Sequence, residues 1–316
     1  MKKVLIIHYS QTGQLTDILK SIAAPMEKNA GISVTFARIA PKTPYPFPWG
    51  FWRFFNTFPE TVYEDAPPVD LVGADLAADY DLVILGYTVW FLSPSQPTTA
   101  FLNMPEAKQL MQDKQVITVI GCRNMWLQAQ ERVKQRLADI GARLTDNVVL
   151  IDSVHSAASF YSTPMWMVFG NKGPYFGGKI PEAGISREDI ARASRFGEAI
   201  AVQLPDRPPQ SSAPMLAGLG AVTINDKLIG SEAVAKRSFK LWGALLRGIG
   251  KPSNPIRVAV IGLYFLFLLT LILTVVPLLA VIKKLLEPLT RAKIAAQHAY
   301  FAAPSGESRA QLDQGA

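Results

Sequence analysis

Residues 258–282, VAVIGLYFLFLLTLILTVVPLLAVI, are the stretch that most constrains how this chain can fold: 25 residues without a charged side chain. Arg257 precedes the run, and Lys283 and Lys284 follow it. A helix rises about 1.5 Å per residue, so the run is long enough to cross a hydrocarbon core of about 30 Å. The alternative, a buried core helix, requires a domain large enough to cover an all-round apolar helix. We predict a transmembrane helix over residues 256–284.

Composition and charge also favour a membrane surface. Apolar residues make up 49% of the chain, and the net charge is +7, with much of the excess between Lys227 and Lys293. This distribution favours anionic membrane lipid as a partner over nucleic acid, which we do not expect to bind. One cysteine and three histidines leave no disulfide framework and no multi-histidine metal site, so we expect no metal.

The predicted location is the bacterial inner membrane, with a single crossing. Lys2 and Lys3 precede only a short apolar run that ends at Ser10, which is not the pattern of a signal peptide. We therefore expect the N-terminal domain to be cytoplasmic. Positive residues flank both ends of the apolar run, so the charge rule does not orient it. Residues 285–316 read as a polar tail without a visible site.

Residues 1–204 alternate between strand and helix patterns. The predicted strands are 4–9, 33–39, 82–87, 116–121 and 147–151, and the predicted helices are 14–28, 98–111, 125–140 and 186–203. Unbroken aliphatic runs such as LVIL and VITVI are typical of parallel strands that are buried on both faces. Ser186 and Asp189 resemble a capping box. We predict an α/β fold with a doubly wound parallel sheet.

Four further segments interrupt or follow this domain. Two aromatic inserts, 41–68 and 152–182, lengthen its loops, and the prolines of the first argue against a long regular helix. A linker is predicted over 205–230, and a basic amphipathic interfacial helix over 231–250. Its apolar face would hold Val234, Leu241, Trp242, Leu245 and Ile249. The alternative is a helix packed on the globular domain.

The loop after the first strand, HYSQTGQLT, combines hydroxyl side chains with one glycine in front of a helix. A phosphate at a helix N-terminus needs free N–H groups and a backbone that can close around it. Ser10, Thr12 and Thr16 add hydroxyls, and Gly13 permits the bend. The motifs Gly-Lys-Ser/Thr and GxGxxG do not occur in this loop, so it is neither a nucleoside-triphosphate loop nor a dinucleotide fingerprint. The alternative is a capped turn without a ligand.

This loop resembles the phosphate loop of the flavodoxin family, Ser/Thr-x-Thr-Gly-x-Thr. Ser10, Thr12 and Gly13 match the pattern, whereas Leu15 stands where the family has threonine. The resemblance implies a flavodoxin-like sheet of five parallel strands in the order 2-1-3-4-5, with FMN bound at its carboxyl edge. It also implies that TVWF and GCRNMW hold the flavin ring. The cofactor-binding residues would be Ser10, Gln11, Thr12, Gly13, Gln14, Leu15, Thr88, Val89, Trp90, Phe91, Gly121, Cys122, Arg123, Asn124 and Trp126.

A second resemblance covers YSQTGQL, YPFPWGFWRFFNTFPE, VWFLSPSQPTTAFL and GCRNMWLQAQE. These segments are similar to a bacterial family tied to dialkylresorcinol and aryl-polyene lipid pathways, often labelled dialkylresorcinol condensing enzymes. The resemblance implies an FMN-dependent oxidoreductase that aromatises a 2,5-dialkylcyclohexane-1,3-dione to the resorcinol, with a ketosynthase as a possible partner. The catalytic candidates are His155 as base, Arg123 beside the reduced flavin, and Tyr161. Candidates for a lipophilic substrate are Trp49, Trp52, Phe55 and Trp166.

Each of these aromatic residues also has a structural explanation, and Arg123 and His155 equally suit roles at a helix start and in a loop. Two other functions remain open. One is an NAD(P)H:quinone oxidoreductase that uses the same flavin. The other is a flavin-free membrane adaptor whose aromatic loops bind a ketosynthase.

Overall fold

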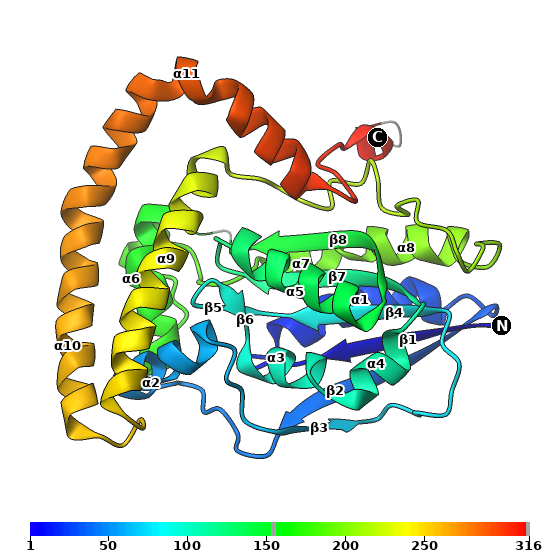
Figure 1. The fold of residues 1–316 in the computed structure, drawn as a ribbon. Helices are drawn as coiled ribbons and strands as arrows, with labels where there is room; N and C mark the ends of the chain where they lie inside the picture. Colours follow the sequence, from blue (N-terminus) through cyan, green and yellow to red (C-terminus); the bar gives the residue numbers. More distant parts are fainter. Residues whose placement is uncertain (153, 155, 314–316) are drawn as a thin grey trace.

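The computed structural model describes residues 1–152, 154 and 156–313. It contains a six-stranded sheet with helices on both faces (Figure 1), and a two-stranded hairpin. The sheet strands are β1 Lys2–His8, β2 Ile32–Pro41, β3 Val69–Val72, β4 Leu82–Tyr87, β7 Gln115–Cys122 and β8 Arg143–Ile151. They lie in the order β3-β2-β1-β4-β7-β8, and every pairing except β2 with β3 is parallel.

The sheet has six strands, so the predicted number of five is wrong. The additional strand, β3, pairs antiparallel with the end of β2 and forms the edge of the sheet. It is only four residues long, and its burial alternates along VDLV. Because it has no unbroken aliphatic run, it lacks the signal that marked the other strands. Those five parallel strands lie in the order β2-β1-β4-β7-β8.

The helices form two layers around the sheet. Helix α1 (Gln14–Glu27) packs with α8 (Ser194–Gln203) on one face, while α3 (Gln96–Leu102), α4 (Pro105–Met111) and α5 (Leu127–Ile140) cover the other (Figure 1). The predicted helix over 98–111 is two helices, because Pro105 starts a new one. The last predicted helix is also two, with α7 (Arg187–Arg192) before α8.

The capping box at the start of α7 is confirmed. Ser186 Oγ accepts the Asp189 N–H at 3.0 Å and donates to the Asp189 carboxylate at 2.7 Å.

Three helices gather beyond the carboxyl edge of the sheet: α2 (Phe51–Val62), α6 (Ser156–Phe169) and α9 (Asp226–Ile249) (Figure 1). A 12-residue helix in the first insert corrects the expectation that prolines would prevent it. Pro44, Pro46 and Pro48 all precede the helix, and Pro59 alone lies inside it. The hairpin of β5 (Val89–Trp90) and β6 (Ser93–Pro94) also lies at this edge.

Helix α9 packs on α2, α5 and the helix that follows it. Its buried positions include Glu232, Lys236, Gly243 and Leu246, whereas Val234, Leu241 and Leu245 of the predicted apolar face are exposed.

The apolar run forms part of a continuous helical segment made of α10 (Pro255–Thr270), a π-helical turn, η2 (Leu271–Val275), and α11 (Val276–Ala302). Within the described residues, Pro255–Leu279 is one helix long and apolar enough to cross a membrane, and 11% of its most apolar window is buried. The segment rises along the flank of the molecule and then bends back over the top (Figure 1). It brings the C-terminal residues beside β8 and the loop before α9.

A buried carboxylate fixes these C-terminal residues on the domain. Asp146, at the core of β8, accepts the backbone N–H groups of Met215 and Leu216 at 3.0 and 2.9 Å. It also accepts the Ser305 hydroxyl at 3.0 Å, and that hydroxyl in turn accepts the Asn147 N–H at 2.8 Å. Burial raises the pKa of Asp146, and these donors lower it. The linker and the tail are therefore joined at one buried point.

The close approach of α8 to α1 generates the first prediction. A Cβ added to Gly197 would collide with the carbonyl oxygen of Ile22, whereas one added to Gly230, on the exposed side of α9, meets nothing within 4 Å. We expect Gly197→Ala to lower the free energy of unfolding by about 1–3 kcal/mol, because the helices must separate. Gly230→Ala, the matched control, should raise it by up to ~1 kcal/mol. Equal effects in denaturant titrations would contradict this packing.

Candidate functional site

The loop after β1 forms an open cradle at the N-terminus of α1. Gly13 is the N-cap residue, in the left-handed conformation with φ 88°, and no side chain caps the helix. Nothing lies within 4 Å of a Cβ built on Gly13. The Ser10 hydroxyl accepts the Gly13 N–H at 3.1 Å, which stabilises the turn between residues 10 and 13. The first turn of α1 therefore begins without a side-chain cap, and the N–H groups and dipole of such a helix N-terminus stabilise an anion.

Two glutamines tie this cradle to the rest of the site. The Gln11 side chain donates to Pro46 O at 2.8 Å and accepts the Trp49 indole N–H at 2.8 Å. Gln14 bonds both the N–H and the carbonyl of Ile185 at 3.3 Å. The loop is thus braced on one side by the first aromatic insert and on the other by the segment that precedes α7.

The other loop hydroxyls differ in their surroundings. Thr12 is exposed, whereas Thr16 Oγ1 is 3.0 Å from Nε2 of buried His8. Burial lowers the pKa of His8, which favours the neutral imidazole. Leu15 is buried in the core below the loop. The Thr16 hydroxyl, one residue after Leu15, is therefore turned toward the strand.

The loop after β4 carries an unpartnered hydroxyl and a packed tryptophan. Thr88 Oγ1 is buried and has no hydrogen-bond partner among the described residues. Trp90 is 9% exposed, and its ring lies 4.9 Å from Trp49, 5.0 Å from Tyr45 and 6.0 Å from Tyr9 in edge-on contacts. These rings form one aromatic cluster between the cradle and the first insert.

Phe91 lies apart from this cluster. It occupies the two-residue turn of the β5–β6 hairpin, where Phe91 and Leu92 both have positive φ. Its ring packs against Phe54 at 4.6 Å and Phe58 at 5.3 Å, on α2. Val89, at the start of the hairpin, is half-buried against the core. Left-handed non-glycine residues cost about 1–3 kcal/mol each, so the contacts around this turn must hold it in place.

The loop after β7 brings a cation to the same edge. Arg123 donates to Ser159 Oγ on α6 at 2.7 and 3.0 Å and lies 4.9 Å from the Phe160 ring. Burial lowers its pKa, and Asp152 opposes that effect. The Asp152 carboxylate accepts the backbone N–H groups of Val154 and Gly184, which joins the end of β8 to the segment before α7.

The remaining residues of this loop contact the helices and the core of the domain. Gly121 lies under α1, beside Ile18. Burial raises the pKa of the Cys122 thiol well above its ordinary value. Asn124 accepts the Met125 N–H at 2.9 Å, and Trp126 is 2% exposed at the start of α5.

Helix α6 also holds two buried hydroxyls, Ser162 and Thr163, without a partner among the described residues.

The four substrate candidates are not gathered around one cavity. Trp49 is 5% exposed and lies in the aromatic cluster, while Trp166 packs on Phe47 at 5.7 Å. The two inserts meet here, because the backbone N–H of Trp49 donates to Met167 O at 2.9 Å. Phe55 packs on Phe265 of α10 at 5.5 Å, and Trp52, half exposed, borders Gly262 of the same helix. The outer face of α2 therefore contacts the apolar helix.

Of the catalytic candidates, His155 lies outside the described residues. Tyr161 is 43% exposed and contacts Tyr175 and Phe176, on the outer side of α6. Arg123 is therefore the catalytic candidate that the structure places closest to the strand ends. An open surface hollow of about 390 Å³ lies elsewhere, between α2 and the loop after α9, and is lined by Glu60, Asp65, Arg247, Gly250, Lys251 and Pro252.

Sequence reasoning missed a buried ionisable pair on α9. Lys236 Nζ donates to Leu92 O at 2.9 Å and to Ser93 Oγ at 2.6 Å, which secures the strained turn. One helical turn earlier, Glu232 accepts the Gln128 N–H at the start of α5 at 3.0 Å. Burial raises the pKa of Glu232 to about 7 and lowers that of Lys236 to about 8. The spacing of Glu232 and Lys236, four residues apart, was the available signal. The prediction of an interfacial helix relied instead on the apolar residues of the other face.

No protein-family model matches the chain, and no curated protein matches it. Among solved structures, it is similar to a flavoprotein from Lactobacillus acidophilus in complex with FMN, at 16% identity and TM-score 0.39, over 47% of this chain and 93% of that one. RosB with bound 8-demethyl-8-formylriboflavin-5'-phosphate gives 12% identity and TM-score 0.36, over 67% and 83%. A flavodoxin from the domain Archaea gives 11% and 0.33, over 63% and 96%. These likenesses are distant, and the site rests on its own geometry.

The buried pair generates a prediction for the pH dependence of stability. The folded pKa of Glu232, about 7, exceeds its ordinary 4.5, so the stability that its protonated form contributes is lost as pH rises between these values. The folded pKa of Lys236, about 8, lies below its ordinary 10.5, so stability should increase as pH rises from 8 to 10.5.

Denaturant titrations across this range provide the test. We expect Glu232→Gln to reduce the fall in unfolding free energy as pH rises from 4.5 to about 7. Lys236→Met should reduce the increase in unfolding free energy as pH rises from about 8 to 10.5. If both variants keep the parent's pH profile, these two groups do not cause it.

Proposed function

We propose that this chain binds FMN at the carboxyl edge of its sheet and acts as an oxidoreductase. The observation that supports this most directly is the cradle at α1. Its N-cap is glycine, its helix has no side-chain cap, and the space before it is open. A phosphate monoester matches such a site, because the helix N-terminus supplies N–H donors and positive potential without a lysine.

The residues around the cradle fit the phosphate and one edge of the ring. Ser10, Thr12 and the backbone of residues 12–15 would hold the phosphate. The unpartnered hydroxyl of Thr88, at the end of the neighbouring strand, fits a hydrogen bond to the polar part of the cofactor. When bound, FMN would supply a two-electron acceptor.

Arg123 would stabilise negative charge at the strand ends. Its guanidinium donates to Ser159 from an exposed position at the edge of the sheet, so its charge is fixed in place there. A fixed cation there would favour the anionic reduced state of a flavin, and therefore reactions in which the flavin accepts electrons.

The substrate class follows from the resemblance and from the apolar surroundings. Converting a 2,5-dialkylcyclohexane-1,3-dione to a dialkylresorcinol removes two electrons and two protons; a bound flavin would accept the two electrons and one of the protons as hydride. A base at the carboxyl edge, with His155 as the candidate, would take one proton, and Tyr161 would bind a ring oxygen. The alkyl chains would lie along the aromatic inserts and the bilayer surface, beside half-exposed Trp52.

We place the enzyme at the inner membrane, with its sheet domain in the cytoplasm. A sparingly soluble substrate concentrates in the bilayer, and a ketosynthase that makes it would be the natural partner.

The first test is the visible spectrum of the detergent-purified protein, together with two variants of the cradle. Asp and Asn both tolerate positive φ, so Gly13→Asp and Gly13→Asn should both fold. The carboxylate would repel the phosphate, because like charges ~4 Å apart repel by about 4 kcal/mol at intermediate dielectric. We expect an oxidised-flavin spectrum for the parent, and FMN affinity on the order of 1,000-fold weaker for Gly13→Asp than for Gly13→Asn, as this repulsion implies.

A colourless protein that takes up no FMN would contradict the proposal and favour the adaptor function. If the flavin is bleached by NADPH with quinone turnover, and not by a dialkylcyclohexanedione, the quinone reductase is the better description.

A second test uses the unpartnered hydroxyl. Thr88→Val removes it with little change of shape, and Thr99→Val removes another buried, unpartnered hydroxyl on α3 as the matched control. Both variants should gain up to ~1–2 kcal/mol in unfolding free energy without FMN, because each loses an unsatisfied polar group. FMN affinity should fall several-fold in Thr88→Val alone. Equal affinity in the two variants would exclude Thr88 from the cofactor site.

A further inference from the structure

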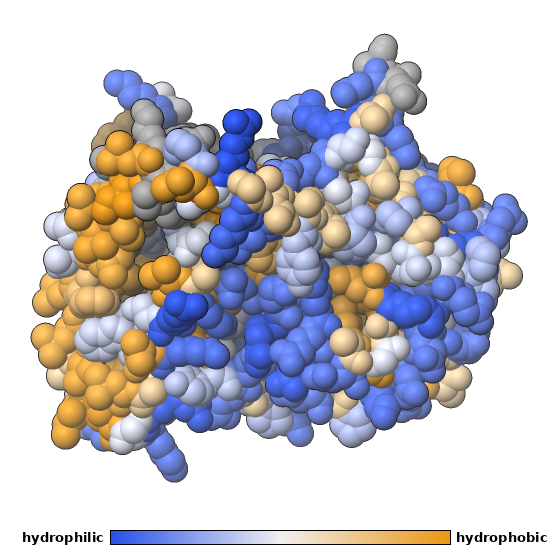
Figure 2. All heavy atoms as spheres, turned by 45° about the horizontal axis from the view of Figure 1, so that its top comes forward, coloured by the Kyte–Doolittle hydropathy of each residue, from blue (hydrophilic) through white to orange (hydrophobic). Residues whose placement is uncertain are grey.

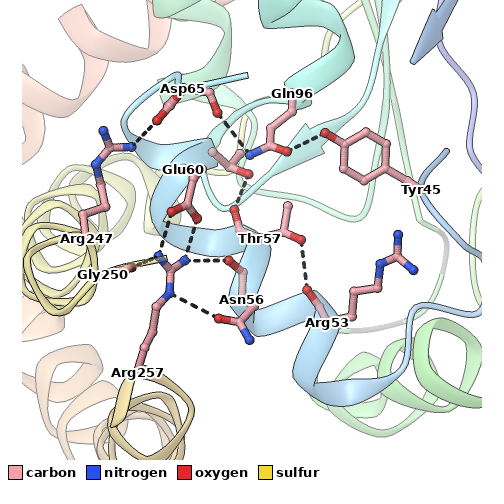
Figure 3. Close-up of polar contacts among 11 residues, drawn as sticks. Tyr45, Arg53, Asn56, Thr57, Glu60, Asp65, Gln96, Arg247, Gly250 and Arg257 are labelled. Atoms are coloured by element: carbon pink, nitrogen blue, oxygen red, sulfur yellow. Dashed lines mark hydrogen bonds and ion pairs between the residues drawn. The ribbon is translucent and has the colours of Figure 1, made fainter. Parts of the chain in front are cut away.

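The start of the apolar helix is fixed to the sheet domain by a fully buried arginine. Arg257 is 0% exposed and makes a two-pronged ion pair with Glu60 of α2, at 2.8 and 2.6 Å. Its guanidinium also donates to the side-chain and backbone oxygens of Asn56, and to Gly250 O (Figure 3). A buried arginine that loses such partners costs several kcal/mol. This end of α10 therefore stays on the domain.

Apolar contacts continue this attachment along α10. Tyr264 stacks on Phe58 of α2, with centroids 4.9 Å apart and planes 5° apart, and it also contacts Trp242 of α9 at 5.1 Å. Ile261, one turn earlier, is 0% exposed. The first half of the apolar run thus lies flat against the domain.

The far end of the segment is attached to the same domain. Phe301 is 8% exposed in the main core, and Ser305 bonds Asp146 as described above. The Tyr300 hydroxyl donates to Glu131 of α5 at 2.8 Å. His298 lies between Asp226 and Glu307, and its Nδ1 is 2.6 Å from Asp226.

Two fixed ends on one domain conflict with a membrane crossing. A single crossing would place residues 255 and 305 on opposite sides of the bilayer. Two crossings need about 40 apolar residues, and the uncharged run has 25. The attachments at both ends therefore exclude a crossing, and they leave both ends of the segment on the side of the sheet domain.

The outer surface between these attachments is apolar and exposed. Figure 2 shows hydrophobic residues gathered along this flank of the molecule. They are Leu263, Leu266, Phe267, Leu269, Leu273, Val275, Leu278, Leu279, Ile282, Leu285 and Leu289, each at least 38% exposed.

Positive charge borders this surface at both ends. Lys251 precedes the helix, and Arg291 and Lys293 follow the apolar residues; all three are exposed. The sequence adds Lys283 and Lys284, against a single acidic residue, Glu287, in the same part of α11. An apolar surface with basic borders matches lipid chains beneath anionic headgroups.

We propose that α10 and α11 form an in-plane anchor, inserted in one leaflet of an anionic bilayer with both ends on the side of the sheet domain. The inner side of α10 is covered by α2 and α9, so the domain takes the place of the polar face that an interfacial helix normally has. The anchor does not depend on FMN binding, since none of its contacts involves the cradle.

Thiol labelling in sealed inside-out membrane vesicles from expressing cells tests the topology. Ala310→Cys places a thiol on the exposed tail, and Ala138→Cys places one on exposed α5 as the control. The parent, with Cys122 alone, sets the background. A membrane-impermeant maleimide should label both new thiols to the same extent without detergent. Labelling of the Ala310→Cys thiol only after detergent would show a single crossing and overturn the proposal.

Flotation with vesicles tests the apolar surface itself. The double variant Leu273→Glu/Leu278→Glu should bind phosphatidylglycerol-containing vesicles at least tenfold more weakly than the parent. Val202→Glu, which alters an exposed apolar residue on α8, should bind like the parent. Phosphatidylcholine vesicles should bind the parent more weakly than anionic ones. If the parent does not float, or if the double variant only converts a larger oligomer to a monomer, a second copy covers this surface and the proposal fails.

Discussion

The parallel pairing of five strands is the constraint on which the rest of this structure depends. Parallel strands all end at the same edge of a sheet, so the loops after β1, β4, β7 and β8 must lie together. At that edge, the uncapped first turn of α1, the Thr88 hydroxyl and the exposed Arg123 become neighbouring features of one region. None of them would form a site alone.

Helix α2 connects this edge to the apolar segment. On one side, the first insert contributes Trp49 and Tyr45 to the aromatic cluster around Trp90. On the other side, Phe55 and Phe58 pack on α10, and Glu60 neutralises Arg257. Under the two proposals, a lipophilic molecule that leaves the bilayer meets α2 before it meets the strand ends. The anchor would then fix the orientation of the site as well as its location.

The five parallel strands could be predicted because each is an aliphatic run buried on both faces, a pattern that local sequence carries. The edge strand β3 could not, since four residues with alternating burial resemble a loop. Helix α2 was missed because proline content was weighed without regard to position. The attachment of Ser305 to Asp146 joins residues 159 positions apart through polar atoms, and no periodic signal announces such a contact. The cradle could be recognised from its sequence motif. The roles of Gln11 and Gln14 could not, because their hydrogen-bond partners lie far away in the sequence and approach them only in the folded protein. The packed face of α9 could not be predicted, because two of its buried residues, Glu232 and Lys236, are charged and charged residues usually mark an exposed face.

The central claim is that the first turn of α1 holds the phosphate of a flavin nucleotide. Backbone amide NMR of the purified, isotopically labelled protein during addition of FMN measures this most directly. The account predicts that the amide resonances of Gly13, Gln14 and Leu15 shift strongly and saturably, while that of Lys227, at the N-terminus of α9, stays in place. Unchanged cradle resonances, or equal shifts at both helix termini, would contradict it.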